Sequence, residues 1–234
     1  LAYVQRMTNQ NQAANETLDA YIKLVKNEHY WYQNVLAWHY LWKDEIASSE
    51  KYYQGLIDKY GYAIDSVDSI TILNWRKNEL ADWINKLENV TANKRQDKTI
   101  SALAYAYYLN GQCDLAVDHW ESLLETAPKY FSNIELIANG LSHQAGLTYC
   151  YQSLGNNTKF SAQLTNLQHL VNSFPTNKKQ SFGFDFTKGQ FDLLSGNLPS
   201  LNKTKQGLPI DTSAVRWMIE SDPIYKLVNK GPNS

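Results

Sequence analysis

The sequence lacks the features by which several classes of protein are recognised. Its 22 Lys and Arg residues nearly balance its 23 Asp and Glu residues, giving a formal net charge of −1. No basic field is therefore available to attract nucleic acid or an anionic membrane surface. No apolar run reaches the roughly 18 residues that a transmembrane helix needs. We expect no nucleic-acid partner and no direct insertion into a membrane.

Motifs of catalysis and metal binding are also missing. The sequence contains no HExxH, no GxSxG, no phosphate-binding loop and no GxGxxG. His39 and His119 lie among aromatic residues and are expected to pack, and Cys113 has no neighbour that would activate its thiol. Asp185 is expected to lie in a loop. The sequence predicts no enzymatic activity, no metal and no cofactor.

Helical periodicity is the main pattern that is present. One apolar stripe, spaced i, i+3, i+4 and i+7, consists of Ile100, Leu103, Ala104 and Tyr107. The turn Asn-Gly-Gln at 110–112 ends it, because glycine suits the left-handed conformation at a helix end. A second stripe before Pro128 consists of Ala116, Trp120, Leu123 and Leu124. The pattern predicts two antiparallel helices joined by a short turn.

This helical hairpin recurs along the chain. "LAYAYYLNGQ" at 103–112 echoes "LAWHYLWKDE" at 36–45 and "LAYVQRMTNQ" at 1–10. Equivalent compact residues, separated by 35, 33, 34 and 44 positions, are Ala2, Ala37, Ile70, Ala104 and Thr148. The last spacing indicates an insertion of about ten residues at 129–138. We predict one helical-repeat domain over 1–234, with repeats at about 1–30, 31–61, 64–92, 97–128 and 141–175, then a degenerate hairpin and cap at 184–229. Because Leu1 falls inside the first helix of a repeat, we expect the chain to be part of a longer protein.

The hairpin resembles the tetratricopeptide repeat. That family places a large residue, Leu, a small residue and Tyr on its first helix, then Ala, an aromatic residue and a closing Pro. Here these positions hold Ile100, Leu103, Ala104, Tyr107, Ala116, Trp120 and Pro128. The resemblance implies an all-α fold, a right-handed α-solenoid of stacked hairpins with a degenerate C-terminal cap.

The end of the chain carries a second resemblance. A degenerate repeat, a Trp-bearing segment and then "DPIYKLV" at 222–228 resemble the end of helical-repeat domains in bacterial membrane-anchored winged-helix activators and adenylate cyclases. This resemblance implies the sensor or interaction domain of a larger signalling regulator.

A binding groove is implied by the repeat family, whose first helices line a concave surface. The candidate groove residues are Tyr3, Arg6, Trp38, Leu41, Trp42, Asn74, Trp75, Tyr105, Tyr108, Tyr149 and Gln152. Such a strip of Tyr and Trp suits a protein or peptide segment, since these side chains dominate binding hot spots. Two alternatives are aromatic packing between repeats and a small-ligand pocket. The scarcity of Lys and Arg on these helices argues against capture of a terminal carboxylate.

The two cysteines have a geometric relationship in the predicted array. Cys113 precedes the second helix of one repeat, and Cys150 lies late in the first helix of the next. Because consecutive helices are antiparallel, the two thiols are candidates for a disulfide; the alternative is two unpaired cysteines in the core. A bridge would favour a periplasmic or other extracytoplasmic location, and without it a cytoplasmic location stays open.

The sequence thus predicts a non-catalytic scaffold that binds a protein or peptide in a concave aromatic groove. Two alternatives are a small-ligand sensor domain and a repeat module of a larger enzyme.

Overall fold

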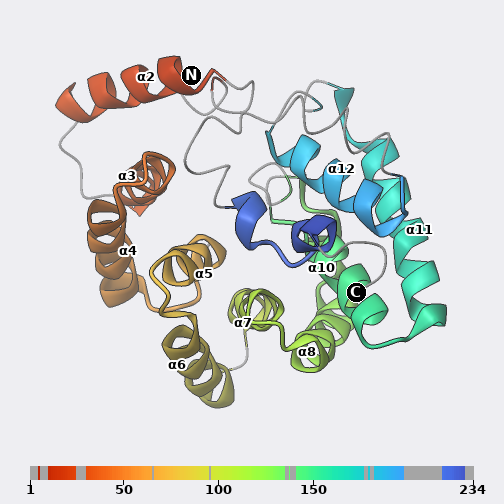
Figure 1. Ribbon diagram of the computed structural model, residues 1–234. Helices are drawn as coiled ribbons and strands as arrows, with labels where there is room; N and C mark the ends of the chain where they lie inside the picture. The colour runs from red at the N-terminus through yellow and green to blue at the C-terminus, as the bar shows by residue number, and fades with distance from the viewer. Residues whose placement is uncertain are drawn as a thin grey trace.

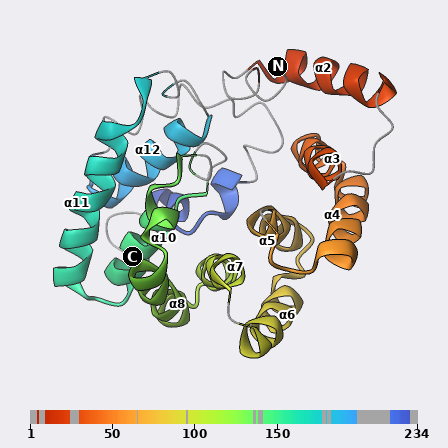
Figure 2. The same ribbon diagram turned by 180° about the vertical axis from the view of Figure 1, so that it is seen from behind.

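The computed structural model is all-helical over the part of the chain that it describes, which comprises residues 5, 10–24, 30–64, 66–94, 96–134, 137, 141–176, 179, 182–197 and 218–229. No β-strand occurs in these residues. The helices follow one another around an arc, from α2 (Asn11–Leu24) to α12 (Phe182–Leu194) (Figures 1 and 2).

Eight of the helices form successive antiparallel pairs. These are α3 (Tyr30–Trp42) with α4 (Ile46–Tyr60), α5 (Val67–Arg76) with α6 (Leu80–Asn93), α7 (Asp97–Leu109) with α8 (Cys113–Thr126), and α10 (His143–Ser153) with α11 (Asn157–Ser173). The first helix of each pair lies on the inside of the arc and the second on the outside; α12 continues the inner row (Figure 1). Between α8 and α10 the chain adds the short 3₁₀ helix η1 (Pro128–Ser132), which overlaps the insertion predicted at 129–138.

The same turn closes five inner helices. Each has one residue of positive φ after the helix, and the five residues are Asp44, Asn78, Gly111, Gly155 and Gly196. In every case the N–H of the following residue donates to a carbonyl five positions back, at 2.8–2.9 Å. The N–H of the left-handed residue donates to a carbonyl three positions back. This is the Schellman motif, which satisfies carbonyls at a helix end. The five left-handed residues are 34, 33, 44 and 41 positions apart.

Counting residues back from these left-handed residues aligns the inner helices with one another, and we call this numbering the turn frame. The turn frame corrects the register predicted for α5. Ala37, Ala104 and Thr148 each stand seven residues before their left-handed residue, as does Gly189 in α12. In α5 that position is held by Thr71 and not by Ile70, which the sequence periodicity favoured. Ile70 and Thr71 are both buried, so burial does not distinguish the two registers, whereas the position of the turn residue Asn78 does.

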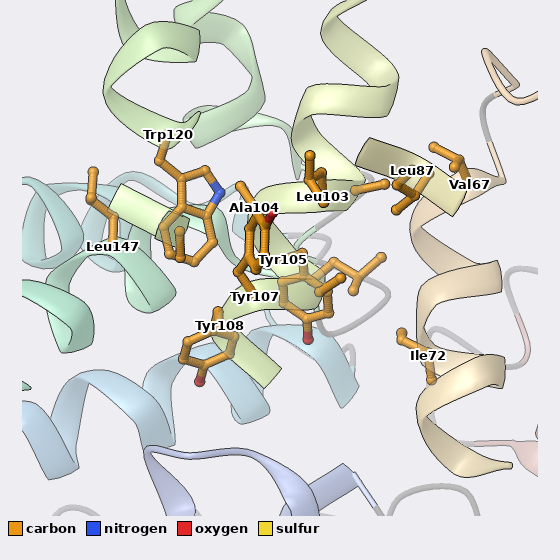
Figure 3. Packing of buried hydrophobic residues seen from close by; sticks show 14 of the residues in the cluster. Val67, Ile72, Leu87, Leu103, Ala104, Tyr105, Tyr107, Tyr108, Trp120 and Leu147 are labelled. Atoms are coloured by element: carbon orange, nitrogen blue, oxygen red, sulfur yellow. The ribbon is translucent and has the colours of Figure 1, made fainter. Parts of the chain in front are cut away.

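The core is centred on α7. All its residues from Thr99 to Tyr108 are buried, since α5, α6, α8 and α10 pack around it. Trp120 of α8 lies fully buried against Gly146 of α10, where a Cβ atom would overlap the indole ring. Figure 3 shows this packing around Ala104. Neighbouring pairs are also joined at equivalent positions, where Tyr107 donates to Glu88 and Tyr151 donates to Glu121.

The end of the array differs from the sequence expectation. Asp185 lies in the first turn of α12, not in a loop, and burial raises the pKa of its carboxyl to about 6. The second helix of the degenerate hairpin predicted from 184 falls outside the described residues. The chain is described again from Met218 to Asn229 and ends in the 3₁₀ helix η3 (Tyr225–Asn229). We call Met218–Asn229 the C-terminal segment.

Candidate binding groove

The inner face of the arc is defined by two positions of the turn frame. Residues six positions before the left-handed residue are Trp38, Ile72, Tyr105, Tyr149 and Gln190, and residues three positions before it are Leu41, Trp75, Tyr108, Gln152 and Leu193. Figure 3 shows Tyr105 and Tyr108 directed to one side of α7, away from Leu103. Four helices in succession therefore present aromatic or long apolar side chains to the inside of the arc, and α12 presents Gln190.

The C-terminal segment lies on this inner face. Both views of the ribbon place it inside the arc, beside α12 and near α7 (Figures 1 and 2). Its Asp222 is buried, and the Oδ2 atom accepts hydrogen bonds from the Tyr108 hydroxyl at 2.8 Å and from Nε2 of Gln190 at 3.0 Å. One carboxylate oxygen thus joins the segment to two inner helices.

Tyr225 makes the second contact between the C-terminal segment and α12. Its ring packs on Phe186 with 4.8 Å between the ring centroids, and its hydroxyl donates to the carbonyl oxygen of Phe186 at 2.9 Å. The hydroxyl lies against Gly189, where a Cβ atom would overlap it. Glycine is therefore required at this position for Tyr225 to fit, and the ring sits in a slot on α12.

The second oxygen of Asp222 organises the segment itself. Oδ1 accepts from the backbone N–H groups of Ile224 at 2.9 Å and Tyr225 at 3.2 Å, which holds the turn that leads into η3. Burial raises the pKa of Asp222 to about 6, while its hydrogen-bond donors oppose that rise. Burial also raises the pKa of the Tyr105 and Tyr108 phenols well above the usual range, so both hydroxyls stay protonated.

A partly open cleft lies next to this contact. It has an empty volume of about 260 Å³, its mouth included. Its lining is mostly apolar, with the hydroxyl and carboxyl groups of the segment at one side; the lining residues are Ile72, Trp75, Tyr105, Leu109, Phe186, Met218, Ser221 and Asp222. The cleft brings α5 and α7 of the array together with α12 and the C-terminal segment.

The predicted groove residues differ in where the structure places them and in how far they are buried. Tyr3, Arg6 and the side chain of Trp42 lie outside the described residues. Trp75 and Tyr105 meet at the cleft, and Tyr108 contacts Asp222. Trp38 and Tyr149 are half-buried, Leu41 is buried and Gln152 is exposed.

Asn74 is among the predicted groove residues because the register predicted for α5 is shifted by one residue. It stands four positions before Asn78, where α7 has Tyr107, and its Nδ2 donates to the Ile70 carbonyl of its own helix at 2.9 Å. It does not belong to the inner-face positions.

A buried polar chain runs behind the inner face. Ser101 of α7 donates to Oδ1 of Asp68 at 3.5 Å and contacts Nε2 of His143 at 2.8 Å, while the Trp120 indole donates to Nδ1 of His143 at 3.1 Å. Burial raises the pKa of Asp68 to about 7 and lowers the pKa of His143 to about 4. The chain links α5, α7, α8 and α10.

This arrangement does not activate Ser101 as a nucleophile. Nδ1 of His143 accepts a hydrogen bond from the Trp120 indole N–H, so this nitrogen carries no proton. The neutral ring therefore carries its proton on Nε2, and this N–H donates a hydrogen bond to Ser101. The lone pair that a general base would need is therefore not directed at the serine. All four side chains are buried, and the network serves to satisfy polar groups within the core.

Cys113 and Cys150 form a disulfide, with 4.9 Å between their Cα atoms. The bond joins the start of α8 to α10 in the next pair, and both residues are buried. Among the described residues, no group of three or more His, Cys, Asp or Glu side chains gathers in a way that could hold a metal ion.

Sequence reasoning missed the partners of the C-terminal segment, namely Phe186, Gly189 and Gln190 on α12. The Gly-Asn pair at 196–197 matches the helix-ending Gly-Asn at 155–156 and marks the end of the first helix of the degenerate hairpin predicted from 184, but no signal in the sequence pairs that helix with the segment beyond it. The chain matches no protein-family model, no curated protein and no solved structure. None of the described helices is long and apolar enough to cross a membrane.

Proposed function

We propose that this protein is a non-catalytic scaffold that binds a protein or peptide segment on the inner face of its helical arc. One observation carries the proposal: the inner face already holds a segment of polypeptide, Met218–Asn229, through a buried carboxylate and a buried aromatic ring. Peptide recognition uses these same elements, a few aromatic anchors in pockets and a small number of directed hydrogen bonds.

We further propose that the helix pairs form a right-handed solenoid of tetratricopeptide type, ending in a degenerate hairpin. The recurring Schellman turns support this, since two of their four spacings, 34 and 33, match the period of about 34 residues in that family. The equivalent contacts Tyr107–Glu88 and Tyr151–Glu121 support it as well, because the same junction occurs between two successive sets of neighbouring pairs.

The part of the inner face offered to a partner is the half nearer to α3. Trp38 and Trp75 are half-buried there, whereas Tyr105 and Tyr108 are buried. Large rigid rings with polar tips supply binding energy at low cost in side-chain entropy.

The scaffold would serve as the sensor or interaction domain of a larger signalling regulator, outside the cytoplasm. The buried disulfide supports an oxidising compartment. The resemblance of the DPIYKLV tail to membrane-anchored regulators points in the same direction. A repeat module of a larger enzyme is the corresponding alternative for the parent protein.

A second candidate function is a small-ligand sensor. The cleft between α5, α7, α12 and the C-terminal segment favours it, since Trp75, Tyr105 and Asp222 line one partly open space. A ligand there would quench the fluorescence of Trp75, and the Trp75→Phe variant would lose that signal.

The scaffold proposal is tested by selecting random 12-residue peptides displayed on phage with the immobilised full chain. Enriched peptides should bind the Trp75→Ala variant at least about tenfold more weakly, because loss of an aromatic hot-spot anchor costs about 2 kcal/mol or more and tenfold corresponds to about 1.4 kcal/mol. The matched control is Trp31→Ala, a tryptophan that is 58% exposed and lies outside the inner-face positions. No enrichment, or equal weakening by both substitutions, would contradict the proposal.

A further inference from the structure

The C-terminal segment is attached to the array in a different way from every helix pair. Paired helices are joined by tight turns, whereas residues 198–217 connect α12 to the segment. A stretch of about 20 residues spans at most roughly 70 Å when fully extended. A connection of this number of residues does not by itself determine where the segment lies.

The two carboxylate oxygens of Asp222 accept hydrogen bonds from different partners. Oδ1 accepts the N–H groups of Ile224 and Tyr225 and so holds Asp-Pro-Ile-Tyr in one conformation. Oδ2 accepts from Tyr108 and Gln190 and so attaches that conformation to the face. Pro223 further limits the backbone. A ligand that is ordered before it binds loses less conformational entropy on binding.

The receiving surface is shaped for this turn. Gly189 leaves the space that the Tyr225 hydroxyl fills, Phe186 supports the ring, and Ile224 is completely buried. Gly189 stands seven positions before its left-handed residue, as Ala37, Thr71, Ala104 and Thr148 do before theirs. Of these five residues only Gly189 is a glycine. The slot is specific to α12.

Building on the proposed function, we infer that the α7–α12 part of the inner face is a recognition site for a pre-formed Asp-Pro-Ile-Tyr turn, and that the C-terminal segment of a second copy of this chain occupies it in exchange for the chain's own. The ligand that fits the site is carried by every copy, on a connection long enough to leave its own array. Such exchange of an identical element between copies forms a closed dimer without any new contact. The local concentration of each segment then determines whether the site holds the chain's own segment or that of the second copy.

A complementation experiment tests this inference with two full-chain variants. The segment variant, Asp222→Ala with Tyr225→Ala, keeps an intact site but has no ligand. The site variant, Gly189→Leu, fills the tyrosine slot but keeps an intact segment. Native mass spectrometry should show a 26.8 kDa monomer for each alone and a complex of one copy of each in the mixture. A mixture that stays monomeric overturns the inference.

The matched control replaces the site variant by a chain carrying Gly189→Leu, Asp222→Ala and Tyr225→Ala together. This chain has neither site nor ligand, and it should form no complex with the segment variant. A complex of equal abundance in this control would place the contact elsewhere and overturn the inference.

A synthetic peptide of residues 218–229 separates the source of the ligand from the site. It should bind the segment variant, and the same peptide with Tyr225→Ala should bind roughly 30-fold more weakly, as loss of a buried aromatic anchor predicts. Peptide binding without a mixed complex would overturn the second copy as the occupant and leave a partner protein's segment instead. Absence of peptide binding, while the phage-selected peptides still bind at Trp75, would overturn the inference and leave the proposed function standing.

Circular dichroism of the segment variant provides the check on folding. Met218, Ile224 and Tyr225 belong to the same buried cluster as the helix pairs. Helix content should nevertheless be retained, because the variant truncates only two side chains of the segment and leaves the contacts between the helix pairs in place. Loss of helix content, both in this variant and in the milder Asp222→Asn chain, would show that the segment belongs to the folding core and would overturn the inference.

Discussion

The hydroxyl of Tyr108 donates to Oδ2 of Asp222 at 2.8 Å, across 114 positions of sequence. Both groups are buried, so the bond replaces water for each of them. It connects the central helix of the array to a segment that follows the last inner helix. The inner face is therefore completed by a part of the chain that lies far from it in sequence.

Substitution Tyr108→Phe should remove this bond while keeping the ring. We expect the free energy of unfolding at pH 7 to fall by roughly 1–2 kcal/mol, because Asp222 keeps only Gln190 and its own backbone donors. Urea unfolding measures the change. The control is Tyr105→Phe, a ring on the same face that makes no hydrogen bond with Asp222, and equal losses in the two variants would contradict the assignment.

Asp68 should make stability depend on pH. Burial raises the pKa of its carboxyl from 3.8 to about 7. The folded chain therefore binds this proton from about pH 7 downward, whereas the unfolded chain binds it only near pH 4. The stabilising contribution is complete below pH 3.8 and is lost as the pH rises through about 7.

The variant Asp68→Asn isolates this contribution, since its side chain stays neutral. From pH 4.5 to 7.5 the wild-type chain should lose stability relative to the variant, by at most about 1.4 kcal/mol per pH unit. His143, with a pKa lowered to about 4, acts with the opposite sign but is present in both chains. A difference in urea midpoint that does not change with pH would show that Asp68 does not titrate in this range.

The turn after α7 should be sensitive to the loss of glycine. Gly111 has a φ of 77°, and no atom lies within 4 Å of a Cβ built on it. Gly111→Ala should therefore cost about 1 kcal/mol through backbone strain alone. Gly55→Ala is the matched control, because Gly55 lies within α4 with equal space and negative φ; there alanine should stabilise the chain by about 0.5–1 kcal/mol. Thermal unfolding distinguishes the opposite signs.

Reduction of the disulfide should destabilise the folded chain. The bond closes a loop with a sequence separation of 37, for which the chain-entropy model gives about 4 kcal/mol. Unfolding with and without reductant measures the loss, and the double variant Cys113→Ser, Cys150→Ser should not respond to reductant. A response of the double variant would mean that the reductant acts on something other than this bond.

Local patterns in the sequence account for much of the helical architecture. The spacing of Leu103, Ala104 and Tyr107 and the glycine at 111 predict a helix and its end, and the structure has both there. The all-α class follows from the same periodicity. The slip at α5 has a local cause: the turn residue is Asn78, which takes a left-handed conformation without the glycine that marks it in sequence.

The occupied inner face could not be predicted in the same way. It depends on a pairing between Tyr108 and Asp222, and no periodicity relates residues in an inner helix to residues in a segment beyond the last one. The concave aromatic strip remains a prediction as a binding surface. Its geometry differs from the expectation in that Tyr105 and Tyr108 are covered, while Trp75 borders an open cleft.

The disulfide between Cys113 and Cys150 also determines how the chain would respond to a pulling force. Tension applied at the two ends would pass through the sulfur atoms and bypass α8, so about 37 residues, or roughly 130 Å of contour length, could not be drawn out. The start of α8 and the end of α10 would stay attached to each other under load, whereas α7 precedes Cys113 and lies outside the protected loop. The C-terminal segment has no such protection, and it would be the first part of the inner face to be pulled away.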